Sequence, residues 1–533
     1  MAVPEHRVPS VMGHLKYRSL DFPFGEGSHS NYDEQYGHNR AASSIDVCRI
    51  SHAIYNKWEP TLPSFCRNYV LLVALSAALF RLIFSDALPR ILWATALFSV
   101  THLAVLGTSI AIYRIAFHPL KRFPGPTLAK LTKWTTTYYT KDGYSHVWLP
   151  ALHEKYGPIV RTGPNELSFS SPSSIKYIHG VQGARLRRGP FYDAHTHNAS
   201  GRGRSIVNSR DWENHRVRRR VWDQGFSQKS LRGYEPRLRD VLNELCEALV
   251  QREASVSWLS PFFQWIPISQ NIKNQTRRSA LLARQQYEQR RPQGTEPNDI
   301  FSHLLAGNEK QQVTKENELA ADAAILFVGG SDPVSVAASF MFYFVLLKPK
   351  VHQRLRAEID AIWDGVVPLE GSLLGHETAP YLNAIINETM RVVPPGPNGM
   401  QRFTNKGGHE VDGVFVPENT ALSSNTIALH HDPNSWTRPL EFIPERWIES
   451  ERDPSWNHDI RAFVPFTLGK FSCVGKPLAM LELRMLLATI VKKFDFIMDQ
   501  EIDVEEPDIC KKQKSFMGML GKQLPVTVHL RKY

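Results

Sequence analysis

The segment at 466–479 constrains the fold of this chain most, because it places one thiol on a glycine-rich loop that leads into a helix. Backbone N–H groups and the positive end of a helix can hold Cys473 as thiolate, which is the form that ligates iron. Gly469 and Gly475 would let the backbone approach a flat macrocycle, and Pro477 suits a first helical turn. A free cysteine can also be a small buried hydrophobic residue, which is its usual fate in an intracellular enzyme.

The spacing of the fixed residues argues against that second interpretation. Phe466, Gly469, Cys473 and Gly475 follow the order Phe, two residues, Gly, three residues, Cys, one residue, Gly. This resembles the haem-binding loop of the cytochrome P-450 family, which implies that Cys473 ligates the iron of haem b. It also implies a mainly α fold with small β-sheets. The family usually has an arginine two residues before the cysteine, facing a haem propionate, where this chain has Phe471.

The chain has 533 residues and a net charge of +11, which limits the classes of partner that it can bind. Such a charge could suit nucleic acid, but the basic residues are spread along the chain and no nucleic-acid-binding motif accompanies them. We therefore expect no nucleic acid partner, and instead a membrane surface or an acidic protein. The five cysteines form no C-x-x-C pair, so neither a structural zinc site nor a disulfide scaffold is indicated.

A membrane anchor is expected at 65–117. An uncharged, mostly apolar stretch at 91–113 is long enough to span a bilayer as a helix. A shorter stretch at 69–84 contains Arg81, so it could be a second span, an interfacial helix, the first half of a hairpin or a buried core helix. Residues 1–64 show no sustained period and are interpreted as a disordered tail or a doubtful start of the gene model.

Basic residues follow the long span directly, namely Arg114, Lys121, Arg122, Lys130 and Lys133. The positive-inside tendency then places the remaining chain in the cytosol. The motifs resemble those of membrane-bound fungal members of the family, which implies the endoplasmic reticulum membrane and a tailoring step in secondary metabolism. Residues 123–126, Phe-Pro-Gly-Pro, cannot continue a helix and resemble the family's hinge between anchor and catalytic body.

Residues 118–533 are predicted to form one haem-thiolate catalytic domain. A strand hairpin is expected from 158–161 and 166–169, which flank a Gly-Pro turn, and a largely helical pattern then continues to Val393. Between about 240 and 300 the chain is shorter than the family usually requires. A mis-spliced gene model or a real loss of helices from the access lid would explain this.

A buried polar network is expected around Glu388. Glu388 and Arg391 lie three residues apart on a predicted helix at 381–393. Taken alone, this pair is most often an ordinary surface ion pair. Arg446 follows where the family places a second arginine, so the resemblance implies a network of Glu388, Arg391 and Arg446. Such a network stabilises little but fixes position well, and we expect it to hold the cysteine loop.

Trp212 and Arg216 are candidates for contact with the haem propionates. They stand four residues apart in a basic segment at 211–222, which could also be a solvated basic face or an RNA-binding patch. In the family, the Trp and the Arg four residues later donate hydrogen bonds to propionates, and a guanidinium suits a carboxylate. Arg402, past a proline-rich turn, is a further propionate candidate by resemblance.

A long apolar stretch at 318–347 resembles the family's oxygen-activating helix. It could also be a plain core helix or a membrane span, but two glycines, Asp332 and Pro333 at its middle favour a distorted helix. In the family an acid and the following Thr pass protons to the oxygen site; Asp332 fits the acid, whereas Pro333 has no hydroxyl. Ser331 and Ser335 lie about 200° round the helix from Pro333, so neither simply replaces the alcohol.

The resemblance implies a haem-dependent monooxygenase that inserts one oxygen atom of O2 into a lipophilic small molecule. Electrons would come from an NADPH-dependent flavoprotein reductase, for which Lys470 and Lys476 are docking candidates. One alternative is a haem-thiolate isomerase or dehydratase that needs no O2 activation, which Pro333 makes less remote. Another is a degenerate, non-catalytic member.

Overall fold

The chain divides into two compact units, which we describe one at a time. In the computed structural model the described residues are 62–83, 88–193, 203–251, 285–296, 299–311, 314–498, 513–515, 519–520 and 526–531. The units are Met1–Ala111 and Ile112–Tyr533. The boundary thus falls close to the predicted end of the anchor at residue 117. The predicted tail, residues 1–64, lies outside the described residues except at its C-terminal end.

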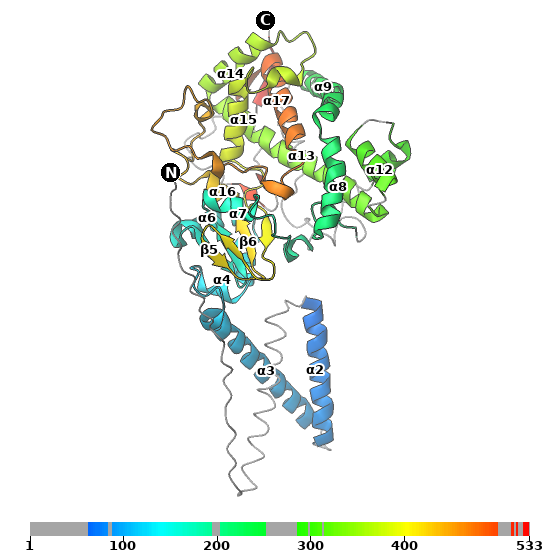
Figure 1. Ribbon diagram of the computed structural model, residues 1–533, viewed down its shortest axis with the longest axis vertical. Coiled ribbons are helices and arrows are strands. Elements are labelled where there is room, and N and C mark those ends of the chain that lie inside the picture. The colour runs from blue at the N-terminus through cyan, green and yellow to red at the C-terminus, as the bar shows by residue number, and fades with distance from the viewer. Residues whose placement is uncertain are drawn as a thin grey trace, which may run out of the picture. The chain divides into compact units, whose positions relative to one another are not determined.

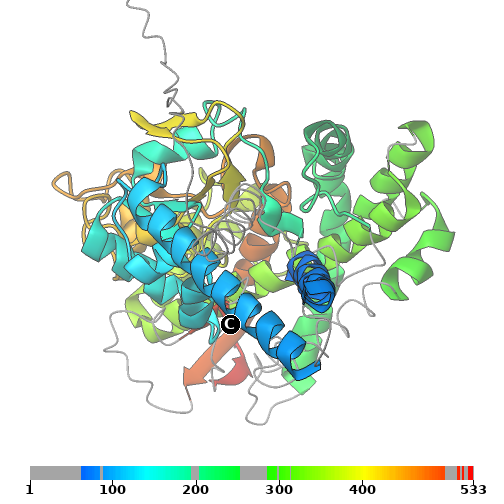
Figure 2. The ribbon, with the colours of Figure 1, turned by 90° about the horizontal axis from the view of Figure 1, so that it is seen from below.

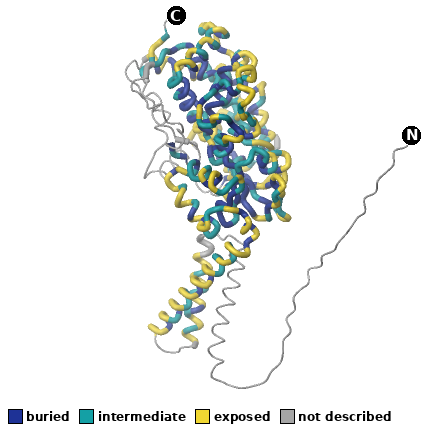
Figure 3. The backbone as a smooth tube through the Cα atoms, turned by 90° about the vertical axis from the view of Figure 1, so that its left-hand side faces the viewer, coloured by how far each residue is buried: buried dark blue, intermediate teal, exposed yellow. Residues whose placement is uncertain are grey.

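The N-terminal unit contains two helices that pack together, α2 (Leu62–Ile83) and α3 (Leu88–Ile112) (Figure 1). The Tyr69 hydroxyl of α2 donates to the Ser99 carbonyl of α3 over 3.1 Å, and Phe80 meets Phe98 with ring centroids 6.2 Å apart. Most other positions of both helices are exposed (Figure 3). Residues 69–83 therefore form a helix that packs on α3, and the choice between a second span and a helix at the membrane surface stays a prediction.

Two helices among the described residues are long and apolar enough to cross a membrane. One runs over Leu88–Phe117, with mean hydropathy 1.6, and includes the predicted span at 91–113. The other, α13 (Glu316–Leu347), has mean hydropathy 1.5 but packs into the core of the C-terminal unit. Length and composition alone therefore suggest membrane association through α3 only weakly.

The C-terminal unit is mainly helical. Its α-helices are α4 (Thr127–Leu131), α5 (Trp134–Thr140), α6 (Ser145–Tyr156), α7 (Pro172–Ile178), α8 (Trp212–Gly225), α9 (Gln228–Gln251), α12 (Ile300–Gln311), α13, α14 (Pro349–Ile362), α15 (Pro380–Val392), α16 (Thr426–His430) and α17 (Lys476–Lys493). Its main hydrophobic core lies where α13, α14, α15 and α17 meet α9 (Figure 1). Leu355, Ile385 and Leu487 are fully buried there. Apolar residues at helical spacing on α15 and α17 explain why both helices contribute many residues to this core.

Small sheets complete the unit, as the sequence predicts. The largest has the strand order β1 (Ile159–Gly163), β2 (Glu166–Phe169), β6 (Ala421–Ser424), β3 (Gln401–Phe403). The predicted hairpin is the antiparallel pair β1 and β2. Strand β2 then pairs in parallel with β6, with Glu166 opposite Ala421.

Three further sheets have two strands each. They pair β4 (His409–Val411) with β5 (Val414–Val416), β7 (Phe494–Met498) with β10 (Val526–Leu530), and β8 (Lys514–Ser515) with β9 (Met519–Leu520). The ribbon of β7 and β10 forms the orange and red arrows of Figure 2. The fold class is therefore mainly α with small β-sheets, as predicted.

The proline-rich segment at 123–126 is fastened to β1. The amide of Arg161 donates to the Pro124 carbonyl over 2.7 Å. Gly125 lies so close to this strand that a Cβ atom would stand 2.4 Å from the Arg161 oxygen. Phe123 is buried in the small core beside this sheet. The segment ends the preceding helical region, as expected. Its contacts with β1 hold it against the edge of the sheet.

Two predictions about the middle of the chain have different outcomes. The distortion expected in the central helix does not interrupt it, because α13 continues as α-helix through Pro333. The shortening expected between about 240 and 300 falls mostly on residues 252–284, which lie outside the described residues.

Candidate active site

The loop that carries Cys473 is closed by backbone hydrogen bonds. A short 3-10 helix, η7 (Gly469–Phe471), precedes the cysteine, and α17 begins at Lys476. The Cys473 amide donates to the Phe466 carbonyl over 3.0 Å, and the Ser472 amide donates to the Gly469 carbonyl over 2.9 Å. These bonds place the thiol just before the N-terminus of α17, as the sequence predicts.

Burial and nearby donors act in opposite directions on the pKa of the Cys473 thiol. Burial raises the pKa of this thiol above its usual value, whereas N–H groups of Gly475 and Lys476 and the charge of Arg219 act in the opposite direction. The side chain still keeps solvent-accessible surface. A sulfur that is deeply set, accessible and aimed at by N–H donors is suited to ligate a metal.

Gly469 is required at this position by a contact within the chain. Its φ is +69°, and a Cβ atom would stand 2.0 Å from the His179 carbonyl oxygen. The backbone here therefore lies close to the end of α7. At Gly475 a Cβ atom would make ordinary contact, 3.7 Å from the Cys473 sulfur. Any added side chain would crowd that sulfur first.

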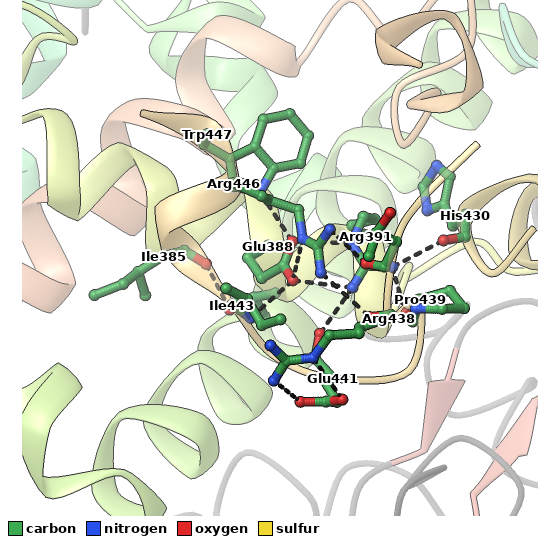
Figure 4. A network of polar contacts seen from close by, with 12 residues as sticks. Ile385, Glu388, Arg391, His430, Arg438, Pro439, Glu441, Ile443, Arg446 and Trp447 are labelled. Carbon is green, nitrogen blue, oxygen red and sulfur yellow. Dashed lines mark hydrogen bonds and ion pairs between the residues drawn. The ribbon is translucent and has the colours of Figure 1, made fainter. Parts of the chain in front are cut away.

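The structure brings Glu388, Arg391 and Arg446 together, and all three side chains are fully buried (Figure 4). Arg391 donates to both carboxylate oxygens of Glu388, each over 2.9 Å. Arg446 Nε donates to Glu388 Oε1 over 2.9 Å. The Ile443 amide and the Trp447 indole each add a donor at 2.9 Å. The carboxylate therefore accepts five hydrogen bonds, from its own helix α15 and from the segment 443–447.

The two guanidinium groups use their remaining N–H groups on backbone carbonyls. Arg391 donates to the carbonyls of His430, Pro439 and Glu441, and Arg446 donates to those of Thr437 and Arg438. Burial alone would raise the pKa of Glu388, but the arginines and the Ile443 amide hold it below its usual value. This network ties α15 to the meandering segment that leads to the Cys473 loop (Figure 4).

The middle of α13 is exposed although both ends of this helix are buried. Residues 328–333 are exposed, whereas Leu319 and Val336 are core residues on either side of them. Leu478 of α17 packs against the clusters that contain both. A Cβ atom added at Gly329 or Gly330 would have no neighbour within 4 Å. Helices α13 and α17 thus pack on each other. The accessible strip lies on α13, and the accessible Cys473 thiol lies on the loop just before α17.

Asp332 lies on this exposed strip. Burial raises the pKa of its carboxyl, and Ser331 acts in the opposite direction. The Ser331 hydroxyl donates to the Phe327 carbonyl over 2.8 Å and lies 3.5 Å from Asp332 Oδ1. Ser335 instead donates to the Asp332 carbonyl over 2.8 Å. Only Ser331 therefore has its hydroxyl next to the Asp332 carboxylate.

The predicted propionate contacts divide into two groups. Arg402 is buried with its guanidinium carbon 4.7 Å from the centre of the Phe471 ring, and Trp212 meets the same ring edge-on at 5.8 Å. Arg216, by contrast, is exposed and donates to Glu213 over 2.6 Å. The structure therefore brings Trp212 and Arg402 to the cysteine loop and does not bring Arg216 there.

Three residues at the loop were missed by the sequence prediction. His215 is buried with its ring 4.7 Å from that of Phe471. Arg219 donates to the Ser472 carbonyl over 2.7 Å. Arg188, on the loop before α8, has its guanidinium carbon 4.3 Å from the Phe471 ring centre. The spacing of His215 and Arg219 relative to buried Trp222 follows one helix face, a signal that was available in the sequence.

The residues at the loop fit a haem group. Buried N–H atoms of Arg188 (Nε), Arg402 (Nη2) and a ring nitrogen of His215 (Nδ1) have no hydrogen-bond partner among the described residues. Carboxylate groups would satisfy such donors, since guanidinium pairs well with carboxylate. Haem has two propionates and an iron that accepts a thiolate. Here the donors surround Phe471, which lies two residues before the Cys473 thiol in the same loop.

Comparison with known proteins now gives the family. The family model "Cytochrome P450" matches residues 256–523. Tryprostatin B 6-hydroxylase of Aspergillus fumigatus is 30% identical over 461 residues, which cover 75% of this chain and 79% of that one. Trichothecene C-15 hydroxylase of Fusarium sporotrichioides is 29% identical over 450 residues, with coverage of 73% and 90%. The chain belongs to the cytochrome P450 family.

A solved structure agrees with this fold. A zebrafish cytochrome P450 with abiraterone covers 73% of this chain and 99% of its own, at TM-score 0.59 and 22% identity. As a family member the chain is a haem-thiolate monooxygenase, an oxidoreductase that uses O2, a redox partner and a lipophilic substrate. The isomerase or dehydratase alternative is not favoured by these relatives.

Proposed function

We propose that this protein hydroxylates a lipophilic small molecule in a fungal secondary-metabolite pathway, with Cys473 as the ligand of haem iron. The observation that carries the proposal is the accessible Cys473 thiol before α17, beside the exposed middle of α13. Curated relatives named as hydroxylases of tryprostatin B and of a trichothecene support the substrate class. When bound, haem supplies a redox-active iron whose thiolate ligand favours O–O cleavage.

Four residues of this chain are proposed to hold the haem propionates. Arg188, Arg402 and Lys470 supply the positive charge, and Trp212 lies beside them at the Phe471 ring. Arg216 would have to leave Glu213 to join them. Phe466 accepts a hydrogen bond from the Cys473 amide through its carbonyl, and its ring would pack beside the cysteine ligand.

Asp332 is proposed to deliver protons to the oxygen site, with Ser331 orienting its carboxyl group. The Ser331 hydroxyl donates its hydrogen to the Phe327 carbonyl, so its oxygen can accept a hydrogen bond from a protonated Asp332 but does not pass the proton on. Burial raises the pKa of Asp332, which favours that protonated form. Pro333, the next residue, has neither a hydroxyl nor an amide hydrogen to contribute.

An NADPH-dependent flavoprotein reductase is the proposed electron donor. Lys476 is exposed beside Cys473, and Arg220 is exposed on α8, the helix that contacts the cysteine loop through Arg219. These charges suit an acidic docking surface. Lys470 is less available than predicted, because it lies over the Trp212 ring and is also bonded to the Ala184 carbonyl.

Anchoring in the endoplasmic reticulum membrane is also part of the proposal. The apolar helix α3 and the basic residues after it support a catalytic unit that faces the cytosol. Co-fractionation of the expressed chain with an endoplasmic reticulum marker, and its resistance to carbonate extraction, would measure this directly.

The decisive experiment uses microsomes that contain this chain and a fungal reductase. The reduced carbonyl complex should show the thiolate-type Soret band, and Cys473→Ser should abolish that band. With substrate, product should form only with NADPH and O2, and isotopically labelled O2 should leave one labelled atom in the product. Turnover without NADPH and O2 would establish the isomerase or dehydratase instead, and a wild-type chain without the thiolate band would be the non-catalytic alternative.

A further inference from the structure

Phe471 is the meeting point of several cationic side chains. The guanidinium carbons of Arg188 and Arg402 lie 4.3 Å and 4.7 Å from the centre of its ring. The Lys470 ammonium lies 4.9 Å from the same point, and the His215 ring meets it at a steep angle, 66°. An aromatic ring attracts cations within about 6 Å of its centroid, and more strongly where water is excluded.

These cations have no carboxylate partner in the described part of the chain. Arg188 donates to the carbonyls of Ile206 and Ser209, and Arg402 donates to the Gln401 carbonyl and the Tyr192 hydroxyl. Both arginines are buried, at 5% and 2% exposed. Burial and then the charge of Arg402 lower the pKa of Arg188 to about 10, although Tyr192 opposes them. A buried positive cluster of this kind needs an anion.

An arginine at position 471 would add a further charge to this cluster. It would stand among Arg188, Arg402 and Lys470, within the distances that the phenyl ring now occupies. Like charges at such separations repel strongly when they are out of water. The phenyl ring instead presents its negative face to neighbouring cations and lets them stay close together.

We propose that Phe471 is a positioning residue for haem, whose ring holds Arg188, Arg402 and Lys470 together as the propionate-binding cluster. This rests on the proposed haem site at Cys473. The ring thus takes the place of a direct propionate contact from position 471. It follows that arginine, the residue usual in the family at this position, weakens haem retention in this chain.

The test measures the rate at which the purified holoprotein transfers haem to excess apomyoglobin. Phe471→Tyr keeps the ring and should stay within about twofold of wild type. Phe471→Leu keeps an apolar side chain but loses the ring, and should lose haem about tenfold faster. Phe471→Arg should lose haem at least as fast as Phe471→Leu. Retention by Phe471→Leu equal to wild type, or slower loss from Phe471→Arg, would overturn the proposal.

A double-mutant cycle separates positioning from ordinary packing. If the ring acts through Arg402, Phe471→Leu should add little to the loss caused by Arg402→Met, whereas independent roles would multiply the two effects. Phe463→Leu is the matched control, since this ring contacts His430 and Trp447 and has no cation over it among the described residues. Its haem transfer should stay near wild type. Failure of Cys473 as ligand would appear separately, as a wild-type chain without the thiolate band.

Discussion

A single carboxylate, that of Glu388, joins helix α15 to the segment 443–447. It is fully buried and accepts hydrogen bonds from Arg391, Arg446, Ile443 and Trp447. Taking one carboxylate and two guanidinium groups out of water costs several kcal/mol for each ion, which only a complete set of partners offsets. Loss of the carboxylate would therefore leave both buried guanidinium groups without a counter-charge.

Glu388→Gln should destabilise the protein by about 3–5 kcal/mol, because a neutral amide leaves two buried guanidinium groups unpaired. Urea unfolding of the purified holoprotein would measure the change, and the thiolate-type carbonyl band should fall with it. Glu441→Gln is the control, since its pair with Arg438 is about half exposed; it should cost less than about 1 kcal/mol. Normal haem incorporation by Glu388→Gln would remove the positioning role from this network.

Glu482 on α17 gives a prediction for pH dependence. Burial raises the pKa of its carboxyl to about 7, and it has no hydrogen-bond or ion-pair partner within the described ranges. Between its usual pKa and this value the folded state binds more protons than the unfolded state, so stability falls as pH rises through that window. Well above pH 7 the cost is complete, at about 3 kcal/mol.

Glu482→Gln should therefore raise the melting temperature at about pH 8 and change it little at about pH 5. Thermal unfolding of both proteins across this range measures the difference. Glu377→Gln, at an exposed position, should stay within about 0.5 kcal/mol of wild type at every pH. An equal effect of Glu482→Gln at both ends of the range would contradict the assignment.

At the level of single residues, local motifs were readable from the sequence and long-range contacts were not. The residues that define the cysteine loop lie within a few positions of one another in the sequence, and so do Glu388 and Arg391. Arg188 reaches Phe471 across a large separation in sequence, and no local pattern marks it. Arg216 was preferred because it lies four residues after a tryptophan, whereas burial of His215 and Trp222 turns Arg219 toward the loop instead.

Among the secondary-structure elements, α13 combines core packing with an exposed middle. Its two ends are buried in separate clusters, so the helix stays fixed while residues 328–333 remain accessible. Pro333 lies within this strip and cannot donate to the carbonyl of Gly329. The element therefore offers an acid, Asp332, without the alcohol that the family usually places next to it.

Pro333→Thr should improve coupling, with about two- to tenfold less hydrogen peroxide released per NADPH consumed, because it supplies a hydroxyl beside Asp332. Peroxide yield and product yield in the same reconstituted reaction measure it. Pro333→Val is the matched control, because it restores the amide hydrogen and a similar volume without a hydroxyl. If Val lowers the peroxide yield as much as Thr, the backbone and not the hydroxyl is responsible.

The elements themselves were predictable to different degrees. Helical spacing predicted α15 and α13 nearly to their ends, and alternation around a Gly-Pro turn predicted the β1–β2 hairpin. The pairing of β2 with β6 was not predicted, because it joins strands far apart in sequence whose residues carry no shared local signal. The contact of Gly469 with the end of α7 was not predicted for the same reason, since His179 is distant in sequence.

For the whole molecule, the N-terminal helices raise the question of topology. Only residues 84–87 separate α2 from α3, and the helices are bonded through Tyr69 and Ser99. With 22 and 25 residues, each is about 33 Å or more in length, which matches the thickness of a bilayer core, although of these two only α3 is also apolar enough to count as a candidate span. If both cross as a hairpin, the N-terminus and the catalytic unit lie on the same side of the membrane.

We therefore expect a glycosylation acceptor fused to the N-terminus to stay unmodified in microsomes, whereas one inserted at 84–87 should be modified. The physical reason is that the short link must then lie in the lumen while both ends remain in the cytosol. An acceptor placed after Tyr533 serves as the cytosolic control. Modification of the N-terminal acceptor would show that α3 crosses alone and that α2 lies outside the bilayer.

The parallel pairing of β2 with β6 also delays completion of the sheet during synthesis. Strand β2 ends at Phe169 and its partner begins at Ala421. At about 5–20 residues per second, a ribosome needs roughly 10–50 s to make the intervening chain. Over that time one edge of the β1–β2 hairpin presents unpaired N–H and C=O groups, which can recruit strands from other chains. Chaperones that cover this edge until β6 is made should therefore raise the yield of folded protein.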